Sequence, residues 1–213
     1  MKVRIIGLFL LFEAAFMLVA SLVALFYFYR CGDGDVLALT VSTILTAISG
    51  FILISAGRKS GQGKHEIENF EIKDSFIIVT LTWVVFALFG MLPFLLNGTV
   101  STVTDAFFEA MSGFTTTGST LLNNIDEQPH GILFWRSIMQ WLGGLGIVFF
   151  TVAILPMFGI DKVQLFAAES TGVSHRKVHS RVAVGSRWIF GIYMLLTVSC
   201  AVSLKVCGME WFD

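Results

Sequence analysis

The sequence contains few charged residues. Only 14% of its 213 residues are Asp, Glu, Lys or Arg, whereas a soluble protein usually carries about 25%. It has no basic run and no aromatic platform of the kind that binds nucleic acid, so we expect no nucleic-acid partner. Its three cysteines form no C-x-x-C pair and no even framework, and they therefore assign no redox compartment. The shortage of charge argues against a soluble domain.

Long apolar blocks are present instead. Hydrophobic residues make up 55% of the chain, and Phe alone accounts for 21 residues. The blocks reach the roughly 20 residues that a helix needs to cross a hydrocarbon core of about 30 Å. They predict membrane spans at residues 5–29, 36–57, 75–96, 131–158 and 185–207. We interpret the first block as a retained helix, because it is too long for a signal peptide and has no small-residue cleavage site. The fold class is an all-α polytopic membrane protein.

The placement of Lys and Arg predicts the orientation of these spans. With a cytoplasmic N-terminus, eleven Lys and Arg residues fall in inner segments and only Arg30 falls in an outer one. Basic residues collect on the cytoplasmic side of membrane proteins. We therefore expect residues 58–74 and 159–184 to lie inside and residues 97–130, which contain no Lys or Arg, to lie outside.

The outer segment contains a stretch that is too short to span and too apolar for a surface loop, residues 102–114. Asp105 and Glu109 are four residues apart, so they share one helical face. After Gly113 and Phe114 the sequence is Thr-Thr-Thr-Gly-Ser-Thr. These residue types do not continue a helix. Non-helical backbone at membrane depth survives only inside protein or beside water. Residues 102–119 are therefore predicted to be re-entrant: a half-helix followed by a loop that lines a cavity.

Such a loop can bind a cation that has lost its water. The half-helix directs its negative C-terminal end at the membrane middle, and backbone carbonyls with threonine hydroxyls replace the hydration shell. A glycine permits a positive φ that turns a carbonyl inward. The predicted ion ligands are Thr115, Thr116, Thr117, Gly118 and Ser119. The alternative is an ordinary outer loop whose Thr, Ser and Gly reflect turn chemistry.

Two adjacent runs carry a resemblance to a known family. The run DAFFEAMSGFTTTGST, followed by FWRSIMQWLGGLGIVFFTVAILPMFG, closely resembles the first repeat of TrkH-type potassium uptake proteins of the Trk/Ktr/HKT superfamily. The resemblance implies a pore of four helix–pore-loop–helix repeats, with Gly118 as one filter glycine, K⁺ as the substrate, no cofactor in this chain and no metal besides K⁺. It also implies a homodimer in the lipid of a bacterial inner membrane, paired with a TrkA-like cytosolic nucleotide-binding regulatory subunit.

The resemblance divides the chain into four parts. Residues 1–74 hold two leading spans and a cytoplasmic loop, and residues 75–158 form the first helix–pore-loop–helix repeat. Residues 159–184 are a cytoplasmic connector, and residues 185–213 hold the first helix of a second repeat. Because one repeat cannot close a four-part filter, we interpret the chain as an N-terminal fragment or a truncated product. A noncatalytic membrane assembly subunit and a less selective Na⁺/K⁺ transporter are the alternatives.

Arg136 lies in the fourth predicted span, where a charge costs about 3 kcal/mol or more unless it has a partner. We expect it to pair with Glu109 or Asp105 and hold the half-helix against the fourth span, with Gln140 on the same helical face. Snorkelling to the interface and a direct role in repelling ions are the alternatives. The nearby glycines at 143, 144 and 146 are expected to let helices approach closely, and otherwise to mark a gating kink.

One acid and one histidine pair have more than one interpretation. Glu13 is an acid within the first span, and the sequence leaves a structural hydrogen bond and an ion site equally open. His175 and His179 have the spacing of a helical metal pair but no third ligand nearby, so a lipid-facing or partner-facing cytoplasmic surface is favoured. No predicted span carries a Ser/His pair, an H-E-x-x-H motif or paired aspartates, and we therefore expect no enzymatic activity.

Overall fold

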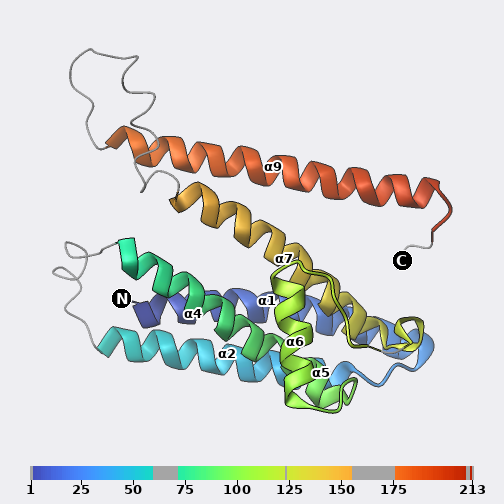
Figure 1. The fold of residues 1–213 in the computed structure, drawn as a ribbon. Helices are drawn as coiled ribbons and strands as arrows, with labels where there is room; N and C mark the ends of the chain where they lie inside the picture. Colours follow the sequence, from blue (N-terminus) through green and yellow to red (C-terminus); the bar gives the residue numbers. More distant parts are fainter. Residues whose placement is uncertain (1, 60–71, 123, 155–175, 210–211, 213) are drawn as a thin grey trace. The chain divides into compact units, whose positions relative to one another are not determined.

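The computed structural model describes residues 2–59, 72–122, 124–154, 176–209 and 212, and these form helices and loops without a β-strand (Figure 1). The chain divides into two compact units, Met1–Gly144 and Leu145–Asp213. The first unit contains both leading helices and the predicted half-helix. The second contains helix α9 (Arg176–Val206).

The two leading helices, α1 (Lys2–Cys31) and α2 (Val36–Lys59), lie side by side (Figure 1). Their backbones approach closely where both carry glycine: a Cβ on Gly7 would lie 2.8 Å from the carbonyl oxygen of Gly50. Farther along the pair, the hydroxyls of Ser21 and Thr43 are 3.2 Å apart. Small residues and paired hydroxyls are the features that bring apolar helices together in a bilayer.

The third predicted span is divided in two. Helix α4 (Ile72–Gly90) ends where helix α5 (Leu92–Asn97) begins. Pro93 lies in the first turn of α5, the position where its missing N–H removes no helical hydrogen bond. Gly98 ends α5 with a φ of 72°, as is usual for a helix C-terminus.

Four segments of the described residues are long and apolar enough to cross a membrane: Val3–Cys31, Val36–Gly57, Phe76–Asn97 and Arg187–Val206. They confirm four of the five predicted spans. The block at 131–158 forms helix α7 (His130–Ile154) and continues past the described residues, so its crossing of the membrane stays a prediction. Helix α9 begins at Arg176, inside the predicted connector; the rest of that connector, with His175, lies outside the described residues.

The predicted half-helix is α6 (Val103–Phe114), and it is followed by the short helix η1 (Ile125–Glu127) and then by α7. The side chain of Thr102 accepts a hydrogen bond from the backbone N–H of Asp105 and caps its N-terminus. Helix α6 packs against α4 and α5. The buried core beside it contains Phe94, Phe114, Ile132, Trp135 and Met139.

Candidate functional site

The C-terminal end of α6 lies against the middle of α7. A Cβ on Gly143 would overlap the carbonyl oxygen of Phe114, so the two backbones are in direct contact. A Cβ on Gly113 would lie 3.2 Å from Met139. At 1.5 Å per residue, Gly143 is about 20 Å along α7 from His130. A distance of this size would carry the end of α6 into a hydrocarbon core of about 30 Å, as the predicted re-entrant segment requires.

The end of α6 is capped by a tight turn. The backbone N–H of Thr116 donates to the carbonyl of Gly113, and that of Thr117 donates to the carbonyl of Ser112, each at 3.0 Å. This is the Schellman pattern, whose left-handed position is usually glycine. Here Thr116 occupies it with a φ of 58°, at a cost of about 1 kcal/mol. The sequence predicted an extended loop from residue 115; the extended part instead begins after this turn.

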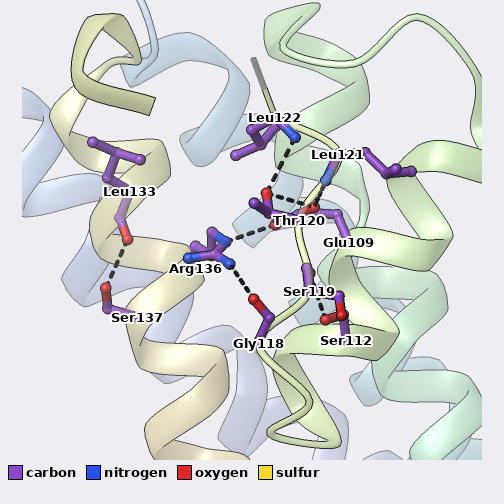
Figure 2. Close-up of polar contacts among 10 residues, drawn as sticks. All are labelled: Glu109, Ser112, Gly118, Ser119, Thr120, Leu121, Leu122, Leu133, Arg136 and Ser137. Atoms are coloured by element: carbon purple, nitrogen blue, oxygen red, sulfur yellow. Dashed lines mark hydrogen bonds and ion pairs between the residues drawn. The ribbon is translucent and has the colours of Figure 1, made fainter. Parts of the chain in front are cut away.

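Beyond the turn, the return segment (residues 118–122) runs back along α6 (Figure 2). Gly118 has a φ of +76° and open space where a Cβ would lie, which agrees with the predicted need for glycine. The hydroxyl of Ser112 donates to the carbonyl of Ser119 at 2.6 Å. Helix α6 thus holds the backbone that follows it.

The carboxylate of Glu109 binds the return segment as well. It accepts hydrogen bonds from the hydroxyl of Thr120 at 3.0 and 3.1 Å and from the backbone N–H of Leu121 at 3.0 Å (Figure 2). The side chain of Glu109 is only 1% exposed. A buried carboxylate needs such donors, because burial without a partner is costly.

Arg136 on α7 supplies the counter-charge. Its Nε lies 2.6 Å from Oε1 of Glu109, and this confirms the predicted pairing of Arg136 with an acid of the half-helix. Asp105 is not that acid. Gln140 is partly buried, and its side chain makes no hydrogen bond within the described part of the chain. A second nitrogen of Arg136, Nη2, donates to the carbonyl of Gly118 at 3.3 Å (Figure 2), a contact that the sequence did not predict.

These contacts distinguish the five predicted ligand residues from one another. The carbonyls of Gly118 and Ser119 accept hydrogen bonds from Arg136 and Ser112. The carbonyls of the three preceding threonines accept none from the described residues. All five residues are exposed. The oxygens that can bind a desolvated cation most directly therefore belong to Thr115, Thr116 and Thr117.

The N-terminal end of α7 is held by two acids that were not predicted from the sequence. Oδ2 of Asp33 accepts from the backbone N–H of His130 at 3.0 Å and lies 2.7 Å from its Nδ1. Oδ2 of Asp35 accepts from the N–H of Ile132 at 3.0 Å. Burial raises the pKa of Asp35. These bonds connect the α1–α2 link to the helix that carries Arg136. A negative charge near a helix N-terminus is favourable, so both aspartates also suit the dipole of α7.

The described residues contain no separate cluster of metal ligands. Among the described residues, no three His, Cys, Asp or Glu side chains gather as a metal site would require. The side chain of His179 and all of His175 fall outside what the structure describes, so their pairing is untested.

The fold is that of an all-α polytopic membrane protein in which two leading helices precede a helix–pore-loop–helix repeat. The model of the TrkH family, described as a cation transport protein, matches residues 42–210. The chain belongs to the TrkH family of cation transport proteins.

Known proteins similar to this chain extend well beyond it. The Trk system potassium uptake protein TrkH of Escherichia coli (strain K12) is 40% identical over 212 residues, which cover 99% of this chain and 42% of that protein. The protein of the same name from Vibrio parahaemolyticus is 42% identical over 214 residues, with the same two coverages of 99% and 42%. The crystal structure of the potassium transporter TrkH from Vibrio parahaemolyticus superimposes with a TM-score of 0.78 at 35% identity and covers 99% of this chain and 40% of that one. The chain thus spans about 42% of the length of these relatives.

Proposed function

We propose that this chain is part of the pore-forming subunit of a Trk-type potassium uptake system, and that residues 115–119 form one segment of its selectivity filter. The proposal rests on three threonine carbonyls at the end of α6, beside the middle of α7, that accept no hydrogen bond from the described residues. The names of the relatives support K⁺ as the ion. K⁺ is the substrate, and no cofactor is part of the proposal.

The site works by replacing water around K⁺. The negative end of the α6 dipole favours a cation, and the carbonyls of Thr115, Thr116 and Thr117 take the place of water oxygens. Arg136 would repel that cation if it stood alone. Glu109, 2.6 Å away, neutralises the guanidinium, so Arg136 can bind the Gly118 carbonyl without imposing a net charge on the pore.

A less selective Na⁺/K⁺ pathway is the second candidate. The carbonyls of Gly118 and Ser119 are engaged by protein donors, which leaves fewer oxygens free for the larger, weakly hydrated ion. The proposal favours K⁺ because the engaged carbonyls fix the backbone that presents the other three. The two candidates differ in one measurable quantity, the ratio of K⁺ to Na⁺ flux.

The decisive experiment measures transport. The protein is expressed in a bacterial host that lacks its own potassium uptake systems, and growth is followed at low external K⁺. Purified protein in liposomes then gives K⁺ and Na⁺ fluxes. K⁺ flux well above Na⁺ flux supports the proposal, and equal fluxes support the less selective pathway. Absence of both fluxes, with the protein present in the membrane, contradicts a conducting role and supports an assembly subunit.

The assembly and orientation are part of the same proposal. We place the chain in a bacterial inner membrane with its N-terminus in the cytoplasm, as a homodimer that binds a TrkA-like cytosolic nucleotide-binding regulatory subunit. The asymmetry of Lys and Arg supports the orientation, and the relatives' name, Trk system, supports a multicomponent assembly. In a variant without native cysteines, a cysteine placed at Asn97 should react with an impermeant reagent from outside, and one placed at Lys64 should not. The reverse pattern contradicts the orientation.

A further inference from the structure

Glu13 is a buried acid that the proposed filter segment does not use. It lies in α1, inside the candidate span Val3–Cys31, and it is the one titratable side chain in the sequence between Arg4 and Tyr27. Its exposure is 0%. Neither carboxyl oxygen has a hydrogen-bond partner among the described residues.

Gly90 shows what surrounds this carboxyl group. A Cβ on Gly90 would lie 3.3 Å from Oε1 of Glu13, 2.6 Å from the ring of Phe114 and 3.3 Å from the sulfur of Met139. Glu13 therefore lies where α1, α4, α6 and α7 meet, close to the last residue of the half-helix. These neighbours offer an aromatic ring and a thioether, so they provide no set of oxygens for a metal cation.

Aromatic contacts flank Glu13 on both sides along α1. The ring of Phe9 meets that of Phe86 at 6.2 Å between centroids, and the ring of Phe16 meets that of Trp141 at 6.2 Å. A tightly packed apolar junction has little room to solvate a charge. Any change in the charge of Glu13 must therefore act on the packing around it.

Among the residues that the structure describes, no counter-charge is committed to Glu13. Helix α4 from Phe76 to Gly90 and helix α2 from Val36 to Gly57 contain no titratable side chain. On α7, Arg136 is bound to Glu109 of α6 and His130 is bound to Asp33. Asp105, the other acid of α6, lies in its first turn, at the opposite end from Phe114. An ionised carboxylate in such surroundings is strongly disfavoured relative to the neutral acid.

We propose that Glu13 is a proton-binding site within the membrane span, occupied in the folded protein, whose proton keeps the inner end of the half-helix in place. The neutral carboxyl group packs against Gly90 beside Phe114. When the proton passes to water, the remaining carboxylate must draw in water or move toward it, which separates α1 from α4 and releases Phe114. The ligand is the proton, and Glu13 is a positioning residue for the segment that follows Phe114. Only the effect on ion flux rests on the proposed function.

The occupancy of the site is tested by infrared spectroscopy on the purified protein at neutral pH. A protonated carboxyl group gives a C=O stretching band separate from those of carboxylates and amides. We expect this band in the wild type and its loss in Glu13→Gln. Glu109→Gln is the matched control: Glu109 is paired with Arg136, so that variant should lose carboxylate absorption and keep the protonated band. A wild-type spectrum without the band, or a band that survives in Glu13→Gln, overturns the proton site.

The positioning role is tested by the pH profile of K⁺ flux in liposomes. Raising the pH from neutral to alkaline should reduce wild-type flux severalfold, and Glu13→Gln, whose amide cannot ionise, should abolish that reduction. Glu13→Ala, which leaves a gap beside Gly90 and Phe114, should have low flux at every pH. Parallel profiles for the wild type and Glu13→Gln overturn the positioning role. Absence of K⁺ flux in all three contradicts the proposed function, and the infrared band then decides the proton site by itself.

Discussion

The half-helix α6 (Val103–Phe114) is held in different ways at its middle and at its C-terminal end. At its middle, a polar cluster (Glu109, Thr120, Arg136) joins it to the return segment and to α7 through an ion pair of 2.6 Å and two hydroxyl contacts of 3.0 and 3.1 Å. At its last residue, Phe114, α6 is held by a backbone contact and not by side-chain hydrogen bonds. The carbonyl of Phe114 lies where a Cβ on Gly143 would be.

The difference separates two requirements of the proposed re-entrant segment. Directional bonds in the polar cluster set how the return segment is turned, because hydrogen bonds weaken steeply when they are misaligned. The glycine contact sets how closely the end of α6 approaches α7, because two backbones meet at a fixed separation. A polar cluster can be rebuilt with other donors and acceptors. A backbone contact through glycine cannot, since any added atom occupies the same space.

The largest effect is expected at the glycine contact. Gly143→Ala adds a Cβ that overlaps the Phe114 carbonyl, so α6 and α7 must separate. Overpacking of this kind usually costs about 1–3 kcal/mol and occasionally more, and the movement displaces the threonine carbonyls that follow Phe114. We expect K⁺ uptake to be lost even where the protein reaches the membrane. Uptake and membrane-inserted protein are measured together, with Gly34→Ala as control, because a Cβ on Gly34 meets nothing within 4 Å.

The second effect tests the polar cluster. Arg136→Gln leaves the carboxylate of Glu109, only 1% exposed, without its counter-charge, and breaking a buried pair in this way costs about 3–5 kcal/mol. Glu109→Gln should cost less, because Arg136 is 18% exposed and reaches water more readily. Exchanging the two charges should recover part of the loss. Thermal unfolding measures all three, with the exposed neighbour Ser137→Ala as control. Parent-like stability of Arg136→Gln would show that the pair contributes nothing.

The third effect compares two glycines that share a backbone conformation. Gly118 and Gly98 have φ values of +76° and +72°, and a Cβ on either meets nothing within 4 Å. Serine at either site should therefore cost a similar amount of stability, about 1 kcal/mol. Only Gly118→Ser should lower the ratio of K⁺ to Na⁺ flux, because only Gly118 follows the threonine carbonyls. A similar fall of this ratio in Gly98→Ser would mean that the ratio responds to a general loss of stability and not to the threonine carbonyls.

The sequence predicted the parts of this arrangement that depend on local pattern or on an isolated charge. Apolar length predicted five spans, of which four match candidate spans of the structure, and the change of residue type predicted an end of the half-helix near Gly113, one residue before the observed end at Phe114. Arg136 required a partner because a lone charge in a span is costly, and the predicted half-helix carries only two acids, Asp105 and Glu109. Its bond to the Gly118 carbonyl was beyond prediction, because it depends on the exact course of the return segment.

The parts that were missed depend on tertiary structure. Threonine is a poor residue for the left-handed position of a helix cap, so nothing in the sequence indicated that Thr116 would occupy it. The contacts of Asp33 and Asp35 with the start of α7 join residues 97 positions apart. The pattern Cys-Gly-Asp-Gly-Asp indicates only a turn with negative charge. Which helix the charges would cap follows from the packing of α1 beside α7.

The smallest effect concerns the N-terminal end of α7, where Asp35 makes a further polar contact away from the proposed filter segment. Burial raises the pKa of Asp35, and its Oδ1 has no partner among the described residues. Between the usual and the raised pKa, the folded state therefore binds more protons than the unfolded state, and the stability that this proton supplies is lost as the pH rises. Asp35→Asn keeps an oxygen for the N–H of Ile132 but cannot ionise. Unfolding temperatures measured across the acidic range should fall with rising pH more steeply in the wild type than in Asp35→Asn. Two parallel curves would show that Asp35 titrates alike in the folded and unfolded states. An altered ratio of K⁺ to Na⁺ flux in Asp35→Asn would show that the N-terminal end of α7 is coupled to the polar cluster.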